Sequence, residues 1–172
     1  VTLIVVAWAL PANAYVVYRA PKSDQPLRWC VSTVGIRFSA VVPQEIPWED
    51  ARDAVAASID PWNALDDCNL PRLTFDGSSE TDHVGPFDQC DDNENLVIFV
   101  RDQGAWSDKG FASDAIAMTT LTFDDSTGVL VDGDVELNDW SFKFSVANPV
   151  PAQRIDVLNT VIHEPGHFFG LH

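Results

Sequence analysis

The feature that most constrains this chain is a pair of histidines, His163 and His167, four residues apart, with Glu164 directly after the first. Residues four apart lie on the same face of an α-helix, so the two imidazoles can bind one metal ion only if this segment is helical. A glutamate beside such a pair is a candidate general base. The spacing therefore predicts a helix, with His163 and His167 as zinc ligands.

The residues before the motif also predict a helix. Apolar side chains recur at helical spacing at Ile155, Leu158 and Val161, a pattern typical of a helix that packs on a sheet. We expect this helix to begin near Gln153. Pro165 has no N–H to donate to the carbonyl of Val161, which costs about 3 kcal/mol inside a helix. A kink or a loosened turn is therefore expected there.

The last ten residues resemble the active-site motif of the metzincin zinc endopeptidases, His163-Glu164-Pro165-Gly166-His167-Phe168-Phe169-Gly170-Leu171-His172. They are most similar to the matrixin branch, whose motif is H-E-x-x-H-x-x-G-x-x-H. The resemblance implies that His163 and His167 are the first two zinc ligands and that Glu164 activates water. Gly170 would turn the chain out of the helix.

The third histidine departs from the family spacing. It would come three residues after the glycine, whereas His172 comes two residues after Gly170. Either His172 reaches the metal from a tightened turn or the site is imperfect; we favour the first and expect His172 as third ligand. The family also has a methionine turn after this ligand. Because Met118 is the only methionine, we expect the chain to be incomplete at its carboxyl end.

Four upstream segments show a weaker likeness to secreted bacterial matrixins: Arg28-Trp29-Cys30, residues 60–64, Leu73-Thr74-Phe75 and residues 127–138. The resemblance implies an α+β fold, with a twisted mixed sheet of about five strands packed with two helices. The second helix would carry the H-E-x-x-H motif. On this basis residues 28–172 form the catalytic domain, and residues 15–27 are an N-terminal extension.

Residue patterns support the same fold class. Alternating apolar residues predict a strand at 33–40, and further short strands are expected at 72–75, 96–101, 116–123 and 129–137. Helical spacing from Trp48 to Trp62 predicts one amphipathic helix, which Pro61 should bend or end. We expect Trp48 and Trp62 to serve the core. Strands and two helices in this order form a small α+β domain.

The resemblance also implies where a peptide substrate would bind. In metzincins an edge strand before the active-site helix pairs with the extended substrate, and its counterpart here is residues 115–122. Backbone hydrogen bonds of this kind tolerate many sequences. The expected substrate-binding residues are Ala115, Ile116, Ala117 and Met118.

The amino end predicts export. Residues 3–10 are apolar, and Ala12-Asn13-Ala14 fits a signal-peptidase site before Tyr15, so residues 1–14 are interpreted as a partial signal peptide of a secreted protein. A buried strand is the alternative. The apolar run is too short to span a bilayer, so we expect no membrane span in the mature form. A monomer is expected.

Export permits disulfides, and the chain has three cysteines. We favour a Cys68–Cys90 bridge, because it would close a polar loop that has little apolar surface to bury. A Cys30–Cys68 bridge is the alternative.

The net charge of −16 argues against nucleic acid as a partner. Acidic runs at 88–94, 124–125 and 132–136 offer the oxygen ligands of Ca²⁺, but none matches an EF-hand loop. We therefore favour solvated acidic surface and keep a structural calcium ion as an alternative. His83 is interpreted as loop surface rather than as a metal ligand.

Together these observations predict a secreted zinc metalloendopeptidase that hydrolyses internal peptide bonds of proteins. A zinc protease with a glutamate as third ligand is disfavoured, because Gly170 and His172 follow the other pattern. An alternative of another class is a secreted acidic module for calcium binding or adhesion, with an impaired metal site. Zinc content and peptide cleavage would distinguish the two.

Overall fold

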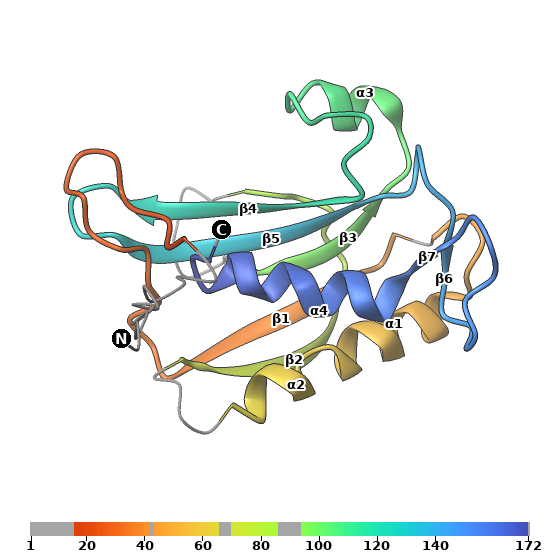
Figure 1. The fold of residues 1–172 in the computed structure, drawn as a ribbon, viewed down its shortest axis with the longest axis horizontal. Helices are drawn as coiled ribbons and strands as arrows, with labels where there is room; N and C mark the ends of the chain where they lie inside the picture. Colours follow the sequence, from red (N-terminus) through yellow and green to blue (C-terminus); the bar gives the residue numbers. More distant parts are fainter. Residues whose placement is uncertain (1–15, 42, 66–69, 86–93, 172) are drawn as a thin grey trace, which may run out of the picture.

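The computed structural model describes residues 16–41, 43–65, 70–85 and 94–171. The predicted signal peptide, Cys68, Cys90 and His172 lie outside these residues. The fold is α+β, with a five-stranded sheet in the order β2-β1-β3-β5-β4 (Figure 1). Its strands are β1 Thr33–Ser39, β2 Arg72–Ser79, β3 Leu96–Val100, β4 Ala117–Asp124 and β5 Val129–Asn138.

The sheet is mixed, as the sequence predicts. The pairs β1·β2, β1·β3 and β3·β5 are parallel, and β4 runs antiparallel to β5 at the sheet edge. All five residues of β3 are buried, which is typical of a central strand covered on both faces. Val97 and Phe99 belong to the main core with the helices, while Ile98 and Val100 pack with Trp106 in a separate cluster.

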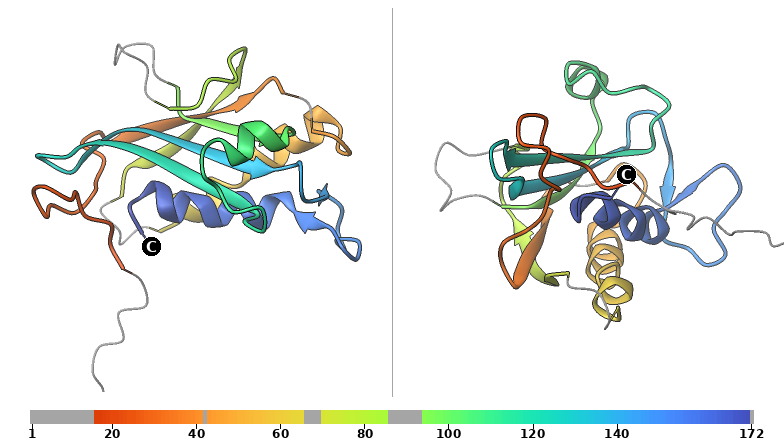
Figure 2. Two further views of the ribbon diagram at one scale, coloured as in Figure 1. Left: turned by 90° about the horizontal axis from the view of Figure 1, so that it is seen from above. Right: turned by 60° about the vertical axis from the view of Figure 1, so that its left-hand side comes forward.

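Two longer helices, α1 Trp48–Ala57 and α4 Val157–Phe168, lie together on one face of the sheet (Figures 1 and 2). The expected single helix from 48 to 62 is two helices, because α1 ends at Ala57 and the short α2 Asp60–Asn63 follows. Pro61 lies in the first turn of α2, where its missing N–H leaves no bond unmade. Trp48 and Trp62 both pack against the main core, which confirms that expectation.

Three short elements were not anticipated. Helix α3, Gln103–Ser107, follows β3 and brings Trp106 onto the face of the sheet away from α4. Strands β6 Phe144–Ser145 and β7 Ile155–Asp156 form a separate two-stranded parallel pair before α4. Within the described part of the chain, no helix is both long and apolar enough to cross a membrane.

The expectation that residues 132–136 form solvated acidic surface is wrong. Asp132, Asp134 and Glu136 are 1%, 0% and 0% exposed, on the face of β5 away from the helices. Asp134 accepts hydrogen bonds from the backbone N–H groups of Gly85 (2.7 Å) and Leu96 (2.8 Å), and the Lys109 ammonium pairs with Glu136. These contacts from Gly85, from the start of β3 and from Lys109 after α3 cover this face of β5.

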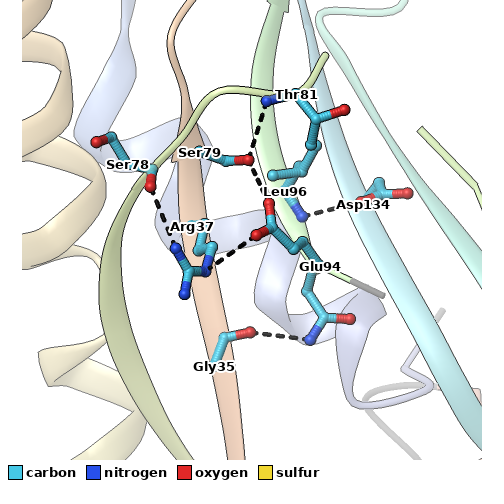
Figure 3. A network of polar contacts seen from close by, with 9 residues as sticks. Gly35, Arg37, Ser78, Ser79, Thr81, Glu94, Leu96 and Asp134 are labelled. Carbon is cyan, nitrogen blue, oxygen red and sulfur yellow. Dashed lines mark hydrogen bonds and ion pairs between the residues drawn. The ribbon is translucent and has the colours of Figure 1, made fainter. Parts of the chain in front are cut away.

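Polar contacts also join the chain before β3 to β1 and β2 (Figure 3). The guanidinium of Arg37 lies 3.5 Å from the carboxylate of Glu94, and Ser79 donates a hydrogen bond to the same carboxylate. The Asn95 side chain donates to the carbonyl of Gly35 at 2.9 Å. These contacts hold the parallel strands in register on the outer face, while the apolar core forms on the inner one.

Candidate metal centre

Helix α4 brings His163, Glu164 and His167 together. One potential ligand atom from each of these side chains lies within 4.8 Å of the others. The two imidazole rings face each other edge-on, with centroids 5.0 Å apart. Among the residues that the structure describes, no other group of three or more His, Cys, Asp or Glu side chains meets in this way. The predicted helical face is therefore present, and its donor atoms suit a divalent metal such as zinc.

The helix begins later than the sequence suggests. Gln153 has a φ of +64°, which a helical residue cannot have, and the N-cap is Asp156. The Asp156 carboxylate accepts hydrogen bonds from the backbone N–H of Asn159 at 3.3 Å and from its side chain at 2.9 Å. An aspartate at this position satisfies an N–H that has no partner within the helix. The N-cap thereby fixes the start of α4 about two helical turns before His163.

Pro165 does not interrupt α4. The helix continues to Phe168, and the carbonyl of Pro165 accepts the N–H of Phe169 at 3.0 Å. It then ends in a Schellman motif: Leu171 N–H donates to Gly166 O at 3.0 Å, and Gly170 N–H donates to His167 O at 2.8 Å. Gly170 has a φ of +80°, the left-handed conformation this motif requires. Its expected role in turning the chain out of the helix is confirmed.

This helix end also orients a candidate ligand. The Nδ1 atom of His167 lies 2.8 Å from the carbonyl oxygen of Leu171. Because a carbonyl only accepts hydrogen bonds, this contact assigns the proton to Nδ1. The lone pair of Nε2 is then available to a metal, the arrangement usual for metal-binding histidines. His163 is exposed and His167 is half-buried, so a metal here would be open to solvent and substrate.

Residues 17–29 support the same helix end. The N–H of Tyr18 donates to the carbonyl of Gly170 at 2.8 Å, and the indole N–H of Trp29 donates to the carbonyl of Phe168, also at 2.8 Å. These donors satisfy carbonyls that have no partner at the end of a helix. The sequence pattern did not reveal this contact, since it joins segments about 140 residues apart.

The side chain of Glu164 is hydrogen-bonded to a residue of the sheet. Glu164 is 5% exposed, and the hydroxyl of Thr119 on β4 donates a hydrogen bond to Oε2 at 2.6 Å. Thr119 was not among the predicted site residues. The only signal in the sequence was alternation, which places it on the same face of β4 as Ala117.

A cavity of about 460 Å³ lies between β4 and α4. Ile116 and Ala117 line it from one side, and His163, Glu164 and His167 line it from the other. Of the expected substrate-binding residues, Ala115 and Met118 instead pack with the cluster around Trp106, on the other face of the sheet. Strand β4 forms the sheet edge beside this cavity.

A second cavity, of about 420 Å³, lies on the other side of the histidine pair. Its walls are mostly apolar and include Trp62, Ile162 and Leu171. The indole N–H of Trp62 donates to the carbonyl of Ile162 at 2.8 Å, which fixes the ring against α4. The candidate metal centre is therefore flanked by one cavity toward the sheet edge and one toward α2.

The remaining candidate residues lie elsewhere. His83 is exposed in the loop after β2, at the surface as expected, and does not join the histidine pair. Cys30 is exposed with a free thiol, so the alternative Cys30–Cys68 bridge is not formed. The structural calcium ion stays a prediction. Asp132, Asp134 and Glu136 are buried, and within the described part of the chain they do not converge as a ligand group.

Comparison of this chain with protein-family models, with curated proteins and with solved structures finds no match. Function is therefore inferred from the geometry of the centre and from the resemblance of its motif.

Proposed function

We propose that this protein is a secreted zinc-dependent metalloendopeptidase of the metzincin type, similar to the matrixins. The observation that carries the proposal is the convergence of donor atoms from His163, Glu164 and His167 within 4.8 Å, beside an open sheet edge. Export rests on the sequence of residues 1–14 alone.

The residues have distinct roles in this proposal. Zinc, when bound, lowers the pKa of a coordinated water to about 7 and polarises the carbonyl of the scissile peptide bond. His163 and His167 hold the ion, and the Leu171 carbonyl keeps His167 in the tautomer that presents Nε2. Glu164 accepts a proton from the attacking water and then delivers it to the leaving amine. A carboxylate oxygen of Glu164 lies within 4.8 Å of a ring nitrogen of each histidine, within reach of a water on the ion.

Catalytic zinc sites usually have three protein ligands and one open position. We propose His172 as the third ligand. It follows Leu171, whose carbonyl accepts from His167 and whose N–H is bonded to Gly166. These two hydrogen bonds hold Leu171, the residue before it, against the end of the helix that carries the histidine pair.

The substrate would be an extended peptide that adds to the edge of β4. An edge strand offers free backbone N–H and C=O groups, so binding of this kind depends little on side chains. The cavity lined by Ile116, Ala117 and the three centre residues would place the scissile bond next to Glu164. A peptide paired with this edge could extend on both sides of the scissile bond, which is the requirement for cleaving internal bonds of proteins.

The test is the Glu164→Gln variant, with Glu80→Gln as an exposed control of the same chemistry. Gln keeps the size of the side chain but cannot take up a proton. With fluorescently labelled casein as substrate, Glu164→Gln should lower kcat by a factor of about 10² to 10⁴ while zinc stays bound. Loss of zinc from this variant, or full activity with zinc bound, would contradict the assigned role of Glu164.

One observation favours the alternative of a secreted calcium-binding or adhesion module. Glu136 is fully buried, and its Oε1 atom has no hydrogen-bond partner among the described residues. A bound cation would satisfy this oxygen. Calcium that raises the Tm of the wild type but not of Glu136→Gln, together with no zinc binding and no cleavage, would favour the module over the protease.

A further inference from the structure

We propose that Thr119 is a positioning residue for the general base: its hydroxyl fixes one carboxylate oxygen of Glu164 so that the other serves proton transfer. This inference rests on the proposed peptidase function. It adds a residue that lies outside the H-E-x-x-H motif, on the strand that would bind the peptide.

The contact has the geometry of a strong hydrogen bond. Thr119 Oγ1 lies 2.6 Å from Glu164 Oε2 and 3.4 Å from the backbone carbonyl of the same residue. The shorter distance falls in the range of a hydroxyl that donates to an ionised carboxylate. Glu164 is 5% exposed as a residue, so water competes weakly for this bond.

The sheet determines that Thr119 faces the helix. In the antiparallel pair, Thr119 is opposite Val135, which belongs to the core beneath the helices. Successive side chains of a strand point to opposite faces, so the next residue, Thr120, points away from α4 and lies opposite the buried Asp134. A shift of one residue in the register of β4 would therefore turn the Thr119 hydroxyl away from Glu164.

The consequence is a defined orientation of the base. A glutamate has three side-chain torsions, and the last of them is broad and poorly restricted. With Oε2 held by Thr119, rotation of the carboxylate is restricted and Oε1 becomes the proton acceptor. Catalytic groups must be held within about 0.5 Å of the productive position, so loss of this restraint lowers the rate of the chemical step. Substrate affinity along β4, which depends on backbone bonds, is unaffected.

The experiment compares Thr119→Val, which removes the hydroxyl at nearly constant volume, with Thr119→Ser, which keeps it. Thr74→Val is the control, a half-buried threonine on β2 at the opposite edge of the sheet. For a quenched fluorescent peptide, Thr119→Val should lower kcat at least about tenfold, as expected for a hydrogen bond to a charged group, with KM within about twofold. Thr119→Ser and Thr74→Val should keep kcat within about threefold of the wild type.

Zinc content, Tm and inhibitor binding provide readouts besides turnover. Zinc per chain should be equal in all variants, and the Tm of Thr119→Val should be lower than that of Thr74→Val, because the buried Glu164 carboxylate loses a hydrogen-bond partner. Acetohydroxamic acid binds catalytic zinc and needs a carboxylate to accept its hydroxyl proton. Its dissociation constant, measured by calorimetry on the zinc-loaded protein, should rise about tenfold in Thr119→Val and stay near the wild-type value in Thr119→Ser.

The outcomes separate this inference from the proposed function. If the wild type cleaves peptides and Thr119→Val matches it in kcat and in acetohydroxamate affinity, Thr119 has no positioning role and the peptidase assignment stands. A change in KM with an unchanged kcat would also overturn the inference. So would a loss of kcat in Thr74→Val equal to that in Thr119→Val. If the zinc-loaded wild type cleaves nothing, the peptidase assignment fails, and the acetohydroxamate affinities still decide whether Thr119 orients Glu164.

Discussion

The imidazole Nδ1 of His167 lies 2.8 Å from the carbonyl oxygen of Leu171, four residues further along the chain. This contact joins the second candidate zinc ligand to the turn that ends α4. It leaves the lone pair of Nε2 available to a metal, and it depends on the left-handed conformation of Gly170. The geometry of the centre is thus determined by the helix and by how the helix ends.

We expect the His167→Ala variant to lose zinc. With one histidine removed, the remaining donors do not form a site of useful affinity, because structural and catalytic zinc sites need at least three protein ligands. Bound zinc, measured by atomic absorption after dialysis, should fall from about one ion per chain to near zero. The far-ultraviolet circular dichroism spectrum should not change.

His83→Ala is the matched control for this variant, because His83 is exposed in a loop and outside the ligand group. It should keep its zinc. Retention of zinc in His167→Ala, or its loss in His83→Ala, would show that the metal binds somewhere else.

Gly170→Ala should be more destabilising than Gly110→Ala. Both glycines have a positive φ, +80° and +78°, so both alanines pay about 1 kcal/mol of backbone strain. At Gly170 the new Cβ would also lie 2.9 Å from the carbonyl oxygen of Leu27, whereas at Gly110 no atom lies within 4 Å. Urea unfolding should therefore give an additional loss of about 1–3 kcal/mol for Gly170→Ala.

The same variant should weaken zinc binding, because a displaced Leu171 carbonyl no longer orients His167. Outer partners of metal-binding histidines typically change affinity by about 10- to 100-fold. Equal stability and equal zinc affinity of the two alanine variants would contradict the importance of the close approach to Leu27.

Pro165→Ala should stabilise the protein. The proline lies inside α4 without an N–H for the carbonyl of Val161, a defect that costs about 3 kcal/mol in a typical helix. Pro165 is buried, and loss of its ring contacts offsets part of this gain, so we expect a net increase of about 1–2 kcal/mol in the free energy of unfolding. A decrease would mean that packing of the ring outweighs the missing hydrogen bond.

Stability should fall as the pH rises from about 4 to about 7. Burial, together with the neighbouring charges of Asp132 and Glu136, raises the pKa of Asp134 to about 7. The folded protein therefore binds a proton at Asp134 that the unfolded chain, with a pKa near 3.9, has already released. Stability from this group is complete below the unfolded pKa and is lost as the pH passes the folded one.

The measurement is the Tm of wild type and Asp134→Asn across this pH range. The amide cannot ionise, so the decline in Tm should be smaller in the variant, although the amide loses one of the two backbone hydrogen bonds. A decline of equal size in both proteins would exclude Asp134 as its source.

Much of the fold could be predicted from local patterns. Alternation identifies the strands, including the edge strand before the motif, because a half-buried strand requires a side-chain period of two. The i, i+4 spacing of His163 and His167 predicts both the helix and the shared ligand face, since that geometry depends on the helix alone. The turn at Gly170, which the resemblance to the matrixin motif implies, follows the end of α4 as expected. The start of α4 could not be predicted in this way, because the positive φ of Gln153 leaves no distinct signal in the sequence.

The amino-acid sequence by itself determined the motif, the helix that carries it and the mixed α+β class, all of which depend on residues close together in the chain. Only the tertiary structure decided the burial of Asp132, Asp134 and Glu136, the hydrogen bond from Thr119 to Glu164, and the packing of residues 17–29 against the end of α4. These features join residues that are tens to more than a hundred positions apart. Which distant segments meet depends on how the whole core packs, and no local periodicity contains that information.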